Sequence, residues 1–309
     1  MKNKSKIRRK SVVFYFIGAF LVIYTVLMLY LFFWGFITSL KATKGVFNVF
    51  RKHEMDFLQG WPWQWEWKNY SVLISKYLYT DIWVKKANGG SDVIRVGFLK
   101  MTLNSIFYAG GGSLIATIVP LIMAYATAKF DYKFNVVIDA TVLVCIAVPV
   151  VGSQPSEIMV LKTLGLFDTW AGYFIQRAHF LSVYYLIFQA AFKSIPKDYS
   201  EAAQVEGAGY YRIMFQLIIP LVGTIFLTIF LINFITFWND YTYPLLYLHS
   251  KPTLAYGIYF LVFKNGENAI ANEPMKMAGS FIMFIPILVI FLCFRKALMK
   301  NLSMGGIKE

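Results

Sequence analysis

The feature that most constrains this chain is a series of six long apolar runs. They are uncharged or nearly uncharged and cover residues 11–40, 101–128, 134–156, 169–192, 217–238 and 277–294. A helix needs about 20 apolar residues to cross the hydrocarbon core of a bilayer, where only helices and closed barrels satisfy their backbone hydrogen bonds. The composition agrees, since 58% of the residues are hydrophobic and 15% are charged. The sequence therefore predicts an all-α integral membrane protein with six transmembrane helices.

Six spans place both termini on the same side of the membrane. Basic segments at 1–10, 129–133 and 193–212 and near the C-terminus share that side, so the positive-inside rule makes it cytoplasmic. Membrane flanks also explain the net charge of +14, so we expect contact with lipid and none with nucleic acid. We expect four regions, listed in chain order: the basic tail and first helix at 1–40, an extracellular loop at 41–100, a five-helix core at 101–298 that includes a cytoplasmic loop at 193–221, and a cytoplasmic tail at 299–309.

The cytoplasmic loop at 193–221 is the one long polar segment between the runs that has the pattern of ordered structure. Asp198 is placed to cap a helix, with Glu201 reaching back to complete a capping box, and Gly207 is placed to end that helix. The small residues Ala202, Ala203 and Gly207 leave one side of the helix open to the close approach of another backbone, while Glu201 and Glu206 supply charge at its edges. This pattern predicts a docking surface for a protein.

Signals for catalysis and metal binding are missing from the sequence. There is no glycine-rich phosphate loop, and His53, His179 and His249 lack the spacing of metal ligands. Cys145 and Cys293 both lie inside apolar runs, which favours packing and predicts neither a disulfide framework nor a metal site. We therefore expect no catalytic residues, no metal and no cofactor, and we do not expect an enzyme.

Polar side chains inside the runs are costly at membrane depth, so they are candidates for function. The candidates for a substrate path are Asn104, Gln154, Glu157, Arg177, Asn233, Trp238, Asn239 and Asp240. Arg177 interrupts the fourth run, where we expect a break between a short outer helix and the main one. It either lines the path or extends to lipid headgroups. Asp139 is expected to cap or pair near the cytoplasmic end of its span.

Two aromatic segments have competing interpretations. Residues 234–248 mix aromatic rings with amide and carboxylate groups, which suits hydroxyl-rich ligands, although anchoring at the membrane interface explains the same residues and is favoured. In the outer loop, Trp61, Trp63, Trp65 and Trp67 alternate with other residues. An interfacial aromatic belt is favoured there over a strand or a sugar-stacking platform.

The cytoplasmic loop also carries a specific resemblance. Glu201-Ala202-Ala203, Gly207 and then Leu217 to Pro220 resemble the EAA loop of bacterial ATP-binding-cassette (ABC) import permeases, with Glu206, Leu217 and Ile219 as conservative departures. The likeness narrows to carbohydrate-uptake permeases of the maltose-transporter type through further segments at 104–105, 164–172, 192–203, 237–245 and 305–308. The long 41–100 loop departs from the short-looped members of that family.

The resemblance implies the type I ABC importer permease fold in a bacterial cell membrane. It implies that the EAA helix, with Glu201, Ala202, Ala203, Glu206 and Gly207, sits in a cleft of a cytoplasmic ATPase. The implied partners are a second homologous permease, two ATPase subunits that hydrolyse the ATP, an extracellular binding protein, and a sugar or oligosaccharide.

Three alternatives stay open at this point. The first is an importer of the same architecture for amino acids, phosphate-like anions or peptides. The second is a proton-coupled secondary carrier that uses Asp139 and Glu157, and the third is a membrane-embedded enzyme acting on lipid-linked sugars.

Overall fold

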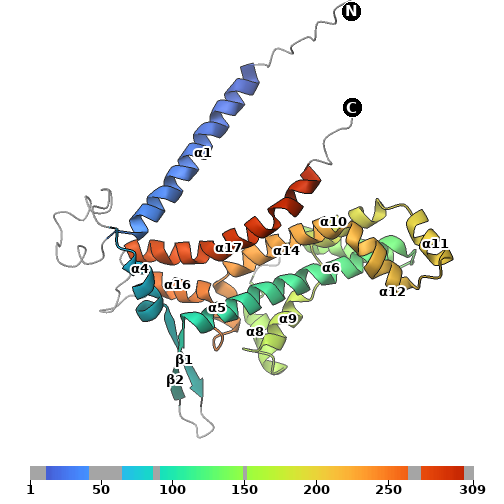
Figure 1. Ribbon diagram of the computed structural model, residues 1–309. Coiled ribbons are helices and arrows are strands. Elements are labelled where there is room, and N and C mark those ends of the chain that lie inside the picture. Colours follow the sequence, from blue (N-terminus) through green and yellow to red (C-terminus); the bar gives the residue numbers. More distant parts are fainter. Residues whose placement is uncertain (1–11, 42–64, 86–90, 149–151, 264–272, 303–309) are drawn as a thin grey trace, which may run out of the picture. The chain divides into compact units, whose positions relative to one another are not determined.

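A computed structural model describes residues 12–41, 65–85, 91–148, 152–263 and 273–302 of the chain, which are mostly helical (Figure 1). The elements in order are α1 (Val12–Ser39), α4 (Lys68–Val72), η1 (Leu73–Tyr77), β1 (Tyr79–Lys85), β2 (Ser91–Gly97), α5 (Phe98–Ile106), η2 (Phe107–Gly111), α6 (Gly112–Lys129), α7 (Asn135–Ala147), α8 (Gln154–Thr163), α9 (Trp170–Arg177), α10 (Val183–Lys193), α11 (Asp198–Val205), α12 (Tyr210–Arg212), η3 (Ile213–Ile218), α13 (Ile219–Leu221), α14 (Gly223–Trp238), α15 (Thr242–Tyr247), α16 (Leu254–Phe263) and α17 (Glu273–Leu302). The segments labelled η are π-helices.

The helical membrane architecture expected from the apolar runs is confirmed. Within the described residues, three helices are long and apolar enough to cross a membrane: Phe14–Ser39, Phe98–Lys129 and Glu273–Arg295. A fourth candidate is the pair Tyr210–Leu221 and Gly223–Trp238, which is bent by 73°. The expected spans at 134–156 and 169–192 contain shorter helices, namely α7 and the pair α9 and α10. The break between α9 and α10 follows Arg177, as the sequence predicts.

The chain divides into two compact units. The first unit contains α1, α4, η1 and the start of α17, up to residue 282. Apolar side chains from Phe14 to Trp34 are exposed along α1, as a lipid-facing helix requires. The end of α1 is buried, because Gly35 faces Phe281 and the amide of Asn69 donates to the carbonyl oxygens of Ser39 (2.9 Å) and Lys41 (2.8 Å). Asn69 thus supplies donors for backbone acceptors that the helix itself leaves free.

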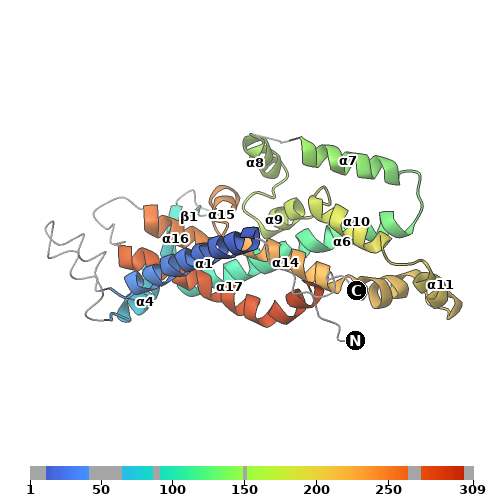
Figure 2. The same cartoon turned by 90° about the horizontal axis from the view of Figure 1, so that it is seen from above.

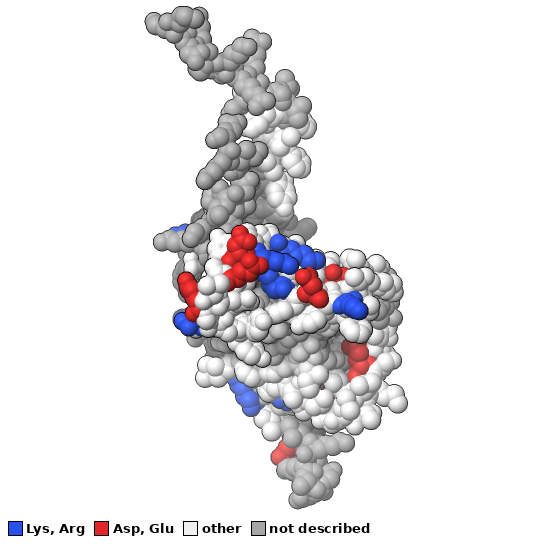
Figure 3. Space-filling model, turned by 90° about the vertical axis from the view of Figure 1, so that its right-hand side faces the viewer, with Lys and Arg blue, Asp and Glu red and all other residues white. Residues whose placement is uncertain are grey.

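The second unit contains residues 78–263 and the rest of α17. Its centre is α6, which packs along α10 on one side and α14 on another (Figure 2). At one end of this unit lie α11 and α12. Seen from that side, the surface carries acidic and basic side chains together (Figure 3). The exposed charged residues of these segments are Lys197, Asp198, Glu201, Glu206 and Arg212.

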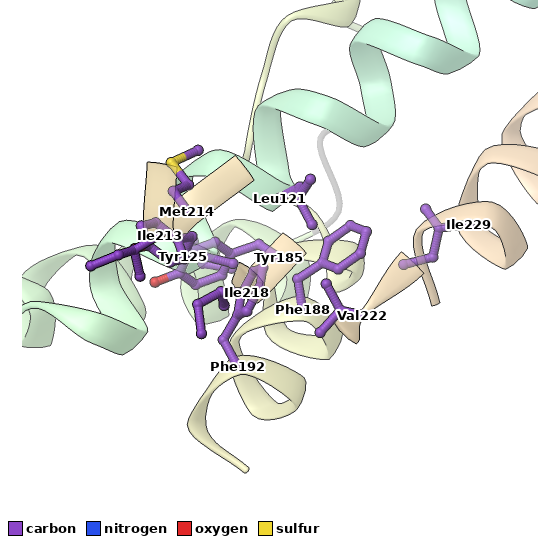
Figure 4. Close-up of a cluster of buried hydrophobic side chains, with 12 residues drawn as sticks. Leu121, Tyr125, Tyr185, Phe188, Phe192, Ile213, Met214, Ile218, Val222 and Ile229 are labelled. Atoms are coloured by element: carbon purple, nitrogen blue, oxygen red, sulfur yellow. The ribbon is translucent and has the colours of Figure 1, made fainter. Parts of the chain in front are cut away.

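A cluster of buried apolar side chains joins this end of the second unit to its centre (Figure 4). It comprises Leu121, Ala124, Tyr125, Val142, Tyr185, Phe188, Phe192, Ile213, Met214, Ile218, Val222 and Ile229. Burial of each large apolar side chain contributes about 1.5–3 kcal/mol. Because the members come from α6, α7, α10, η3 and α14, the cluster fixes the segment that follows α11 against the helices of the core.

Two glycines allow aromatic rings to approach the long helix Phe98–Lys129. A Cβ atom on Gly112 would lie 1.8 Å from the hydroxyl of Tyr173, and one on Gly111 would lie 2.8 Å from Phe174. Gly110 differs, since a Cβ there meets nothing within 4 Å. The approach lets the Tyr173 hydroxyl donate to the carbonyl oxygen of Tyr108 at 2.9 Å. Close packing therefore accounts for two of the three glycines at 110–112.

The sequence did not predict the β-hairpin within the 41–100 region. Strands β1 and β2 pair antiparallel from Tyr79↔Gly97 to Lys85↔Ser91. Asp81 lies opposite Arg95, and their side chains form an exposed ion pair at 3.0 Å. In the tryptophan-rich stretch, Trp61 and Trp63 lie outside the described residues, whereas Trp65 and Trp67 are exposed and belong to no strand. The described part of that stretch gives no support to the strand interpretation.

Candidate coupling helix and polar cavity

Helix α11 begins one residue earlier than the capping box requires, because an N-cap at Asp198 would place the first helical residue at Tyr199. Asp198 is its first helical residue, and the N-cap is Lys197, which makes no side-chain cap hydrogen bond. The predicted capping box is therefore wrong. Asp198 and Glu201 lie in the first turn instead, where negative charge interacts favourably with the exposed N–H groups of the helix.

The end of α11 at Gly207 is confirmed, and it forms a Schellman motif. Gly207 donates to the carbonyl oxygen of Gln204 and Ala208 donates to that of Ala203, both at 2.9 Å. Gly207 has φ +82°, a left-handed conformation that glycine adopts without a steric penalty. A Cβ on Gly207 would meet nothing within 4 Å, so conformation rather than space selects glycine here.

Four of the five residues predicted for coupling are exposed. Glu201, Ala202, Glu206 and Gly207 face outward, whereas Ala203 is half-buried and packs with Ala208 against the apolar cluster. The outward side also presents Val205, which is 90% exposed. An apolar side chain this exposed, beside acidic ones on a short helix, marks a surface suited to a protein partner.

The helix is tied to the core through the segment that follows it. α11 packs against η3, and η3 continues through α13 to a break at Val222. Beyond the break, α14 runs at 73° to the preceding helix. The residues Leu217 to Pro220 that end the EAA pattern thus form the last turns before this bend. The proline has no N–H to donate, which is a common cause of such bends.

A second feature of the same unit is a cavity of about 580 Å³ between α8, α9 and α15. Its lining residues are Ser153, Gln154, Glu157, Gln176, Arg177, Asp240, Thr242, Tyr243, Leu246 and Tyr247. Four of the eight residues predicted for the substrate path meet here: Gln154, Glu157, Arg177 and Asp240. They are as much as 86 positions apart in the sequence.

Arg177 is held by aromatic rings and by a carboxylate. Its guanidinium carbon lies 4.4 Å from the ring centre of Phe237 and 4.7 Å from that of Tyr243. One terminal nitrogen, Nη2, donates to the hydroxyl of Tyr108 at 3.3 Å and lies 3.7 Å from Asp240. Cation–π contacts with a desolvated guanidinium stabilise this arrangement. Arg177 therefore belongs to the cavity, and the alternative of a side chain extending to headgroups is not what the structure shows.

Asp240 links three elements at one wall of the cavity. Its Oδ1 accepts from the backbone N–H groups of Thr242 (2.9 Å) and Tyr243 (3.1 Å), which start α15. Its Oδ2 accepts from the hydroxyl of Tyr108 at 2.6 Å. Backbone N–H groups at a helix start are favourable partners for a carboxylate.

Glu157, on α8, also lines the cavity. Its two carboxylate oxygens accept from the hydroxyls of Ser153 (2.5 Å) and Tyr247 (2.9 Å). The ring of Tyr247 stacks on that of Tyr243, with centres 4.5 Å apart. The hydroxyl of Tyr243 in turn donates to the side-chain oxygen of Gln176.

The other four predicted path residues lie outside this cavity. Asn104 donates to the carbonyl oxygen of Pro252 at 3.0 Å and so secures the approach to α16. Asn233 is buried and donates to Thr117 at 3.3 Å. Trp238 is buried and donates to the carbonyl oxygen of Met283 at 3.0 Å, while the exposed Asn239 bonds to its own helix at Ile235. These four residues bond to neighbouring segments and do not line the cavity, and their place on a substrate path stays a prediction.

Asp139 pairs with neighbouring side chains, as expected. Its Oδ1 accepts from the hydroxyl of Tyr185 at 2.6 Å and from the amide of Gln189 at 2.8 Å, which ties α7 to α10. Glu157 bonds to different partners, so the two carboxylates of the proton-carrier alternative belong to separate networks.

The described part of the chain contains neither a group of metal ligands nor a disulfide. There, no group of three or more His, Cys, Asp or Glu side chains is placed to hold a metal ion. Cys145 and Cys293 are free thiols and both are exposed, which corrects the expectation that they pack in the interior.

Several cavity residues escaped the sequence analysis. Tyr108 lies in the π-helix η2 of the second span, 132 positions before the Asp240 that accepts its hydrogen bond. Gln176 and Tyr247 carried no signal beyond their nearness to Arg177 and to the aromatic segment 234–248. Ser153 directly precedes α8, at a helix start where a serine is unremarkable.

Comparison with known proteins assigns the chain to a family. The model of the family described as "Binding-protein-dependent transport system inner membrane component" matches residues 3–303. The melibiose/raffinose/stachyose import permease protein MelC of Bacillus subtilis is 26% identical over 76% of this chain and 82% of its own length. The trehalose/maltose transport system permease protein MalG of Thermococcus litoralis is 28% identical over 66% of this chain and 74% of its own.

A solved structure shares the fold. One chain of a bacterial ABC transporter involved in the import of the acidic polysaccharide alginate superimposes with a TM-score of 0.70 at 21% identity, covering 95% of this chain and 99% of its own. The likeness confirms the predicted importer permease fold. With the family match over nearly its whole length, the chain belongs to the binding-protein-dependent transport system inner membrane components, as a multi-pass membrane protein.

Proposed function

We propose that this permease serves an ATP-driven importer of sugars or oligosaccharides. It pairs with a second homologous permease, and two cytoplasmic ATPase subunits hydrolyse the ATP. An extracellular binding protein delivers the cargo. Both termini, the 193–221 loop and residues 299–309 lie on the cytoplasmic side, and the 41–100 region lies outside.

The observation that carries the proposal is the form of α11. A helix of eight residues, closed by a Schellman motif, is too short to be stable alone, yet it projects its acidic and apolar side chains away from the core. The residues proposed to meet an ATPase are Glu201, Ala202, Glu206 and Gly207, with Val205 added by its exposure. Ala203 supports them from below through its packing on the cluster.

The sugar cargo is supported by two observations. The relatives named above import melibiose, raffinose, stachyose, trehalose and maltose according to their names. In addition, the cavity combines hydroxyl, amide and carboxylate groups with tyrosine rings, the mixture that hydroxyl-rich ligands require. Four residues predicted for the path line this cavity, and we place the path along it.

Site-specific cross-linking tests the coupling role. In a chain whose two native cysteines are replaced by serine, Val205→Cys should cross-link to a co-purified ATPase subunit, and ATP with vanadate should change the yield. Val137→Cys, an exposed valine position on α7, is the control and should give no such product. A cross-link from Val137 and none from Val205 would overturn the assignment of α11.

The same purified complex separates the alternatives. Uptake into proteoliposomes that depends on ATP and resists a protonophore supports the importer, whereas uptake that a protonophore abolishes would support a secondary carrier. Conversion of a lipid-linked sugar by the chain without partners would support the enzyme alternative. A non-sugar cargo would appear as competition by amino acids, phosphate or peptides and none by oligosaccharides.

A further inference from the structure

The cavity between α8, α9 and α15 is lined by both acidic and basic side chains. Its preference for neutral or charged sugars therefore depends on which of these side chains lacks an oppositely charged partner. We propose that it is a subsite for a neutral, hydroxyl-rich unit of the cargo, and that Glu157 rather than Arg177 makes the discriminating contact. This inference rests on the proposed sugar import and adds the class of sugar.

Arg177 already has an anionic partner. Its guanidinium is already opposed by the carboxylate of Asp240 at 3.7 Å, and Nη2 is engaged by the hydroxyl of Tyr108. Its Nε is fully buried, so a ligand carboxylate cannot reach it to form the fork of Nε and Nη2. A bidentate arginine–carboxylate contact needs two free, parallel N–H groups.

Asp240 is equally committed. Its two oxygens already accept three hydrogen bonds, two from the start of α15 and one from Tyr108. A carboxylate has about four acceptor positions in all. Arg177 and Asp240 thus form a compensated pair that shapes one wall and leaves no net charge there.

Glu157 keeps the uncompensated charge of the cavity. Its oxygens accept one hydrogen bond each, from Ser153 and Tyr247, so about two acceptor positions remain. The charged lining residues are Glu157, Asp240 and Arg177, which sum to one negative charge. Sugar hydroxyls donate to such a carboxylate, whereas the carboxylate of a uronate is repelled by it.

The remaining lining groups match hydroxyls rather than ions. Gln154, Gln176 and Thr242 contribute amide and hydroxyl groups, which both donate and accept. Both faces of the Tyr243 ring are used, by Tyr247 and by Arg177, so hydrogen bonding carries the recognition. The volume of about 580 Å³ falls within the range of about 300–1,000 Å³ for small-molecule sites.

The test is direct binding to the purified full transporter in nanodiscs without its binding protein, followed by calorimetry. Raffinose and maltotetraose are the neutral probes, and tetragalacturonate is the anionic one. We expect a neutral probe to bind more tightly than tetragalacturonate. Raising the salt from about 0.1 M to about 1 M shortens the Debye length from about 10 Å to about 3 Å, and this should improve binding of tetragalacturonate alone.

A substitution at Glu157 tests whether this carboxylate causes the weaker binding of tetragalacturonate. Glu157→Gln keeps the shape and removes the charge, so tetragalacturonate should bind about tenfold more tightly, as expected for loss of a like charge within ~4–6 Å. Asp81→Asn, the same chemical change on the exposed hairpin, is the matched control and should leave both affinities unchanged. Thermal melting of the complex checks that each variant is folded.

Three results would overturn the inference: tighter binding of tetragalacturonate than of the neutral probes, no binding of any probe, or an unchanged preference in a folded Glu157→Gln complex. Failure of the proposed function looks different. In that case the chain would co-purify with no ATPase, or uptake would not depend on ATP, whatever the outcome of the binding experiment.

Discussion

The left-handed conformation of Gly207 makes a sharp prediction about coupling. Gly207→Val should impair uptake and transport-coupled ATP hydrolysis, because the valine must adopt φ +82° to keep α11 closed. The space around the residue is open, so the full effect is conformational. A left-handed residue other than glycine costs roughly 1–2 kcal/mol, which is a factor of about 5 to 30 in the population of the closed turn.

Two matched variants separate conformation from bulk. Gly207→Asn adds a side chain of similar size, but asparagine tolerates the left-handed region, so it should retain most of the activity. Gly209→Val adds the same bulk two residues later, where φ is −71° and a Cβ also meets nothing within 4 Å. It should have little effect. The assay is ATP-dependent uptake into proteoliposomes, normalised to the amount of assembled complex.

Two outcomes would refute this reasoning. Full activity of Gly207→Val would show that the Schellman turn is not needed for coupling. Equal loss in Gly207→Asn and Gly207→Val would show that the partner excludes any side chain at this position, so that contact rather than backbone conformation selects glycine.

Three further predictions concern stability and the carrier alternative. Gly112→Ala should lower the melting temperature, because overpacking against Tyr173 costs about 1–3 kcal/mol, whereas Gly110→Ala in open space should raise it slightly. Asn69→Asp should destabilise the first unit by about 1–3 kcal/mol in chemical denaturation, since an aspartate cannot donate to the carbonyls at the end of α1; an unchanged midpoint contradicts this. Asp139→Asn keeps its acceptor oxygen, so protonophore-resistant uptake should persist, and loss of uptake in a folded variant would favour the proton carrier.

Local signals predicted the helix α11 well and its first residue less well. The end at Gly207 could be predicted because left-handed closure depends on the residue itself. The start could not, because Lys197 and Asp198 are both compatible with the first turn and a cap depends on the geometry of the preceding residues. The break after Arg177 could also be predicted from the residue itself, because a charged side chain interrupts an apolar run.

Which polar residues line the cavity could be predicted from the sequence only in part. The cost of polar groups at membrane depth selected Glu157, Arg177 and Asp240, which line the cavity. The same rule selected Asn104 and Asn233, which do not. Only the fold distinguishes a polar group that faces a cavity from one that bonds to a neighbouring helix. The network around Tyr108 depends on the approach of α9 to η2, which no pattern along the chain reports.

The missed hairpin has a different cause. Thr80 and Ile82 are buried while Asp81 is exposed, so the alternation expected of a strand is present in β1. It was outweighed by the interpretation of the whole 41–100 region as a loop between membrane helices. The pairing of Asp81 with Arg95 could have been suspected, since opposite charges often lie across from each other in antiparallel strands.

The candidate coupling helix α11 is joined to one wall of the cavity by a continuous stretch of chain. α11 packs on η3, the bend at Val222 follows, and α14 then extends over 16 residues, roughly 24 Å, before it reaches Asp240 at the cavity wall. Trp238 is buried at the far end of α14 and bonded to Met283, so that end is anchored in the core. A regular helix resists a change of length, and a bend of 73° is where an angle between two helices changes most easily. In the proposed importer, a displacement of α11 by an ATPase therefore reaches the cavity through the angle at Val222.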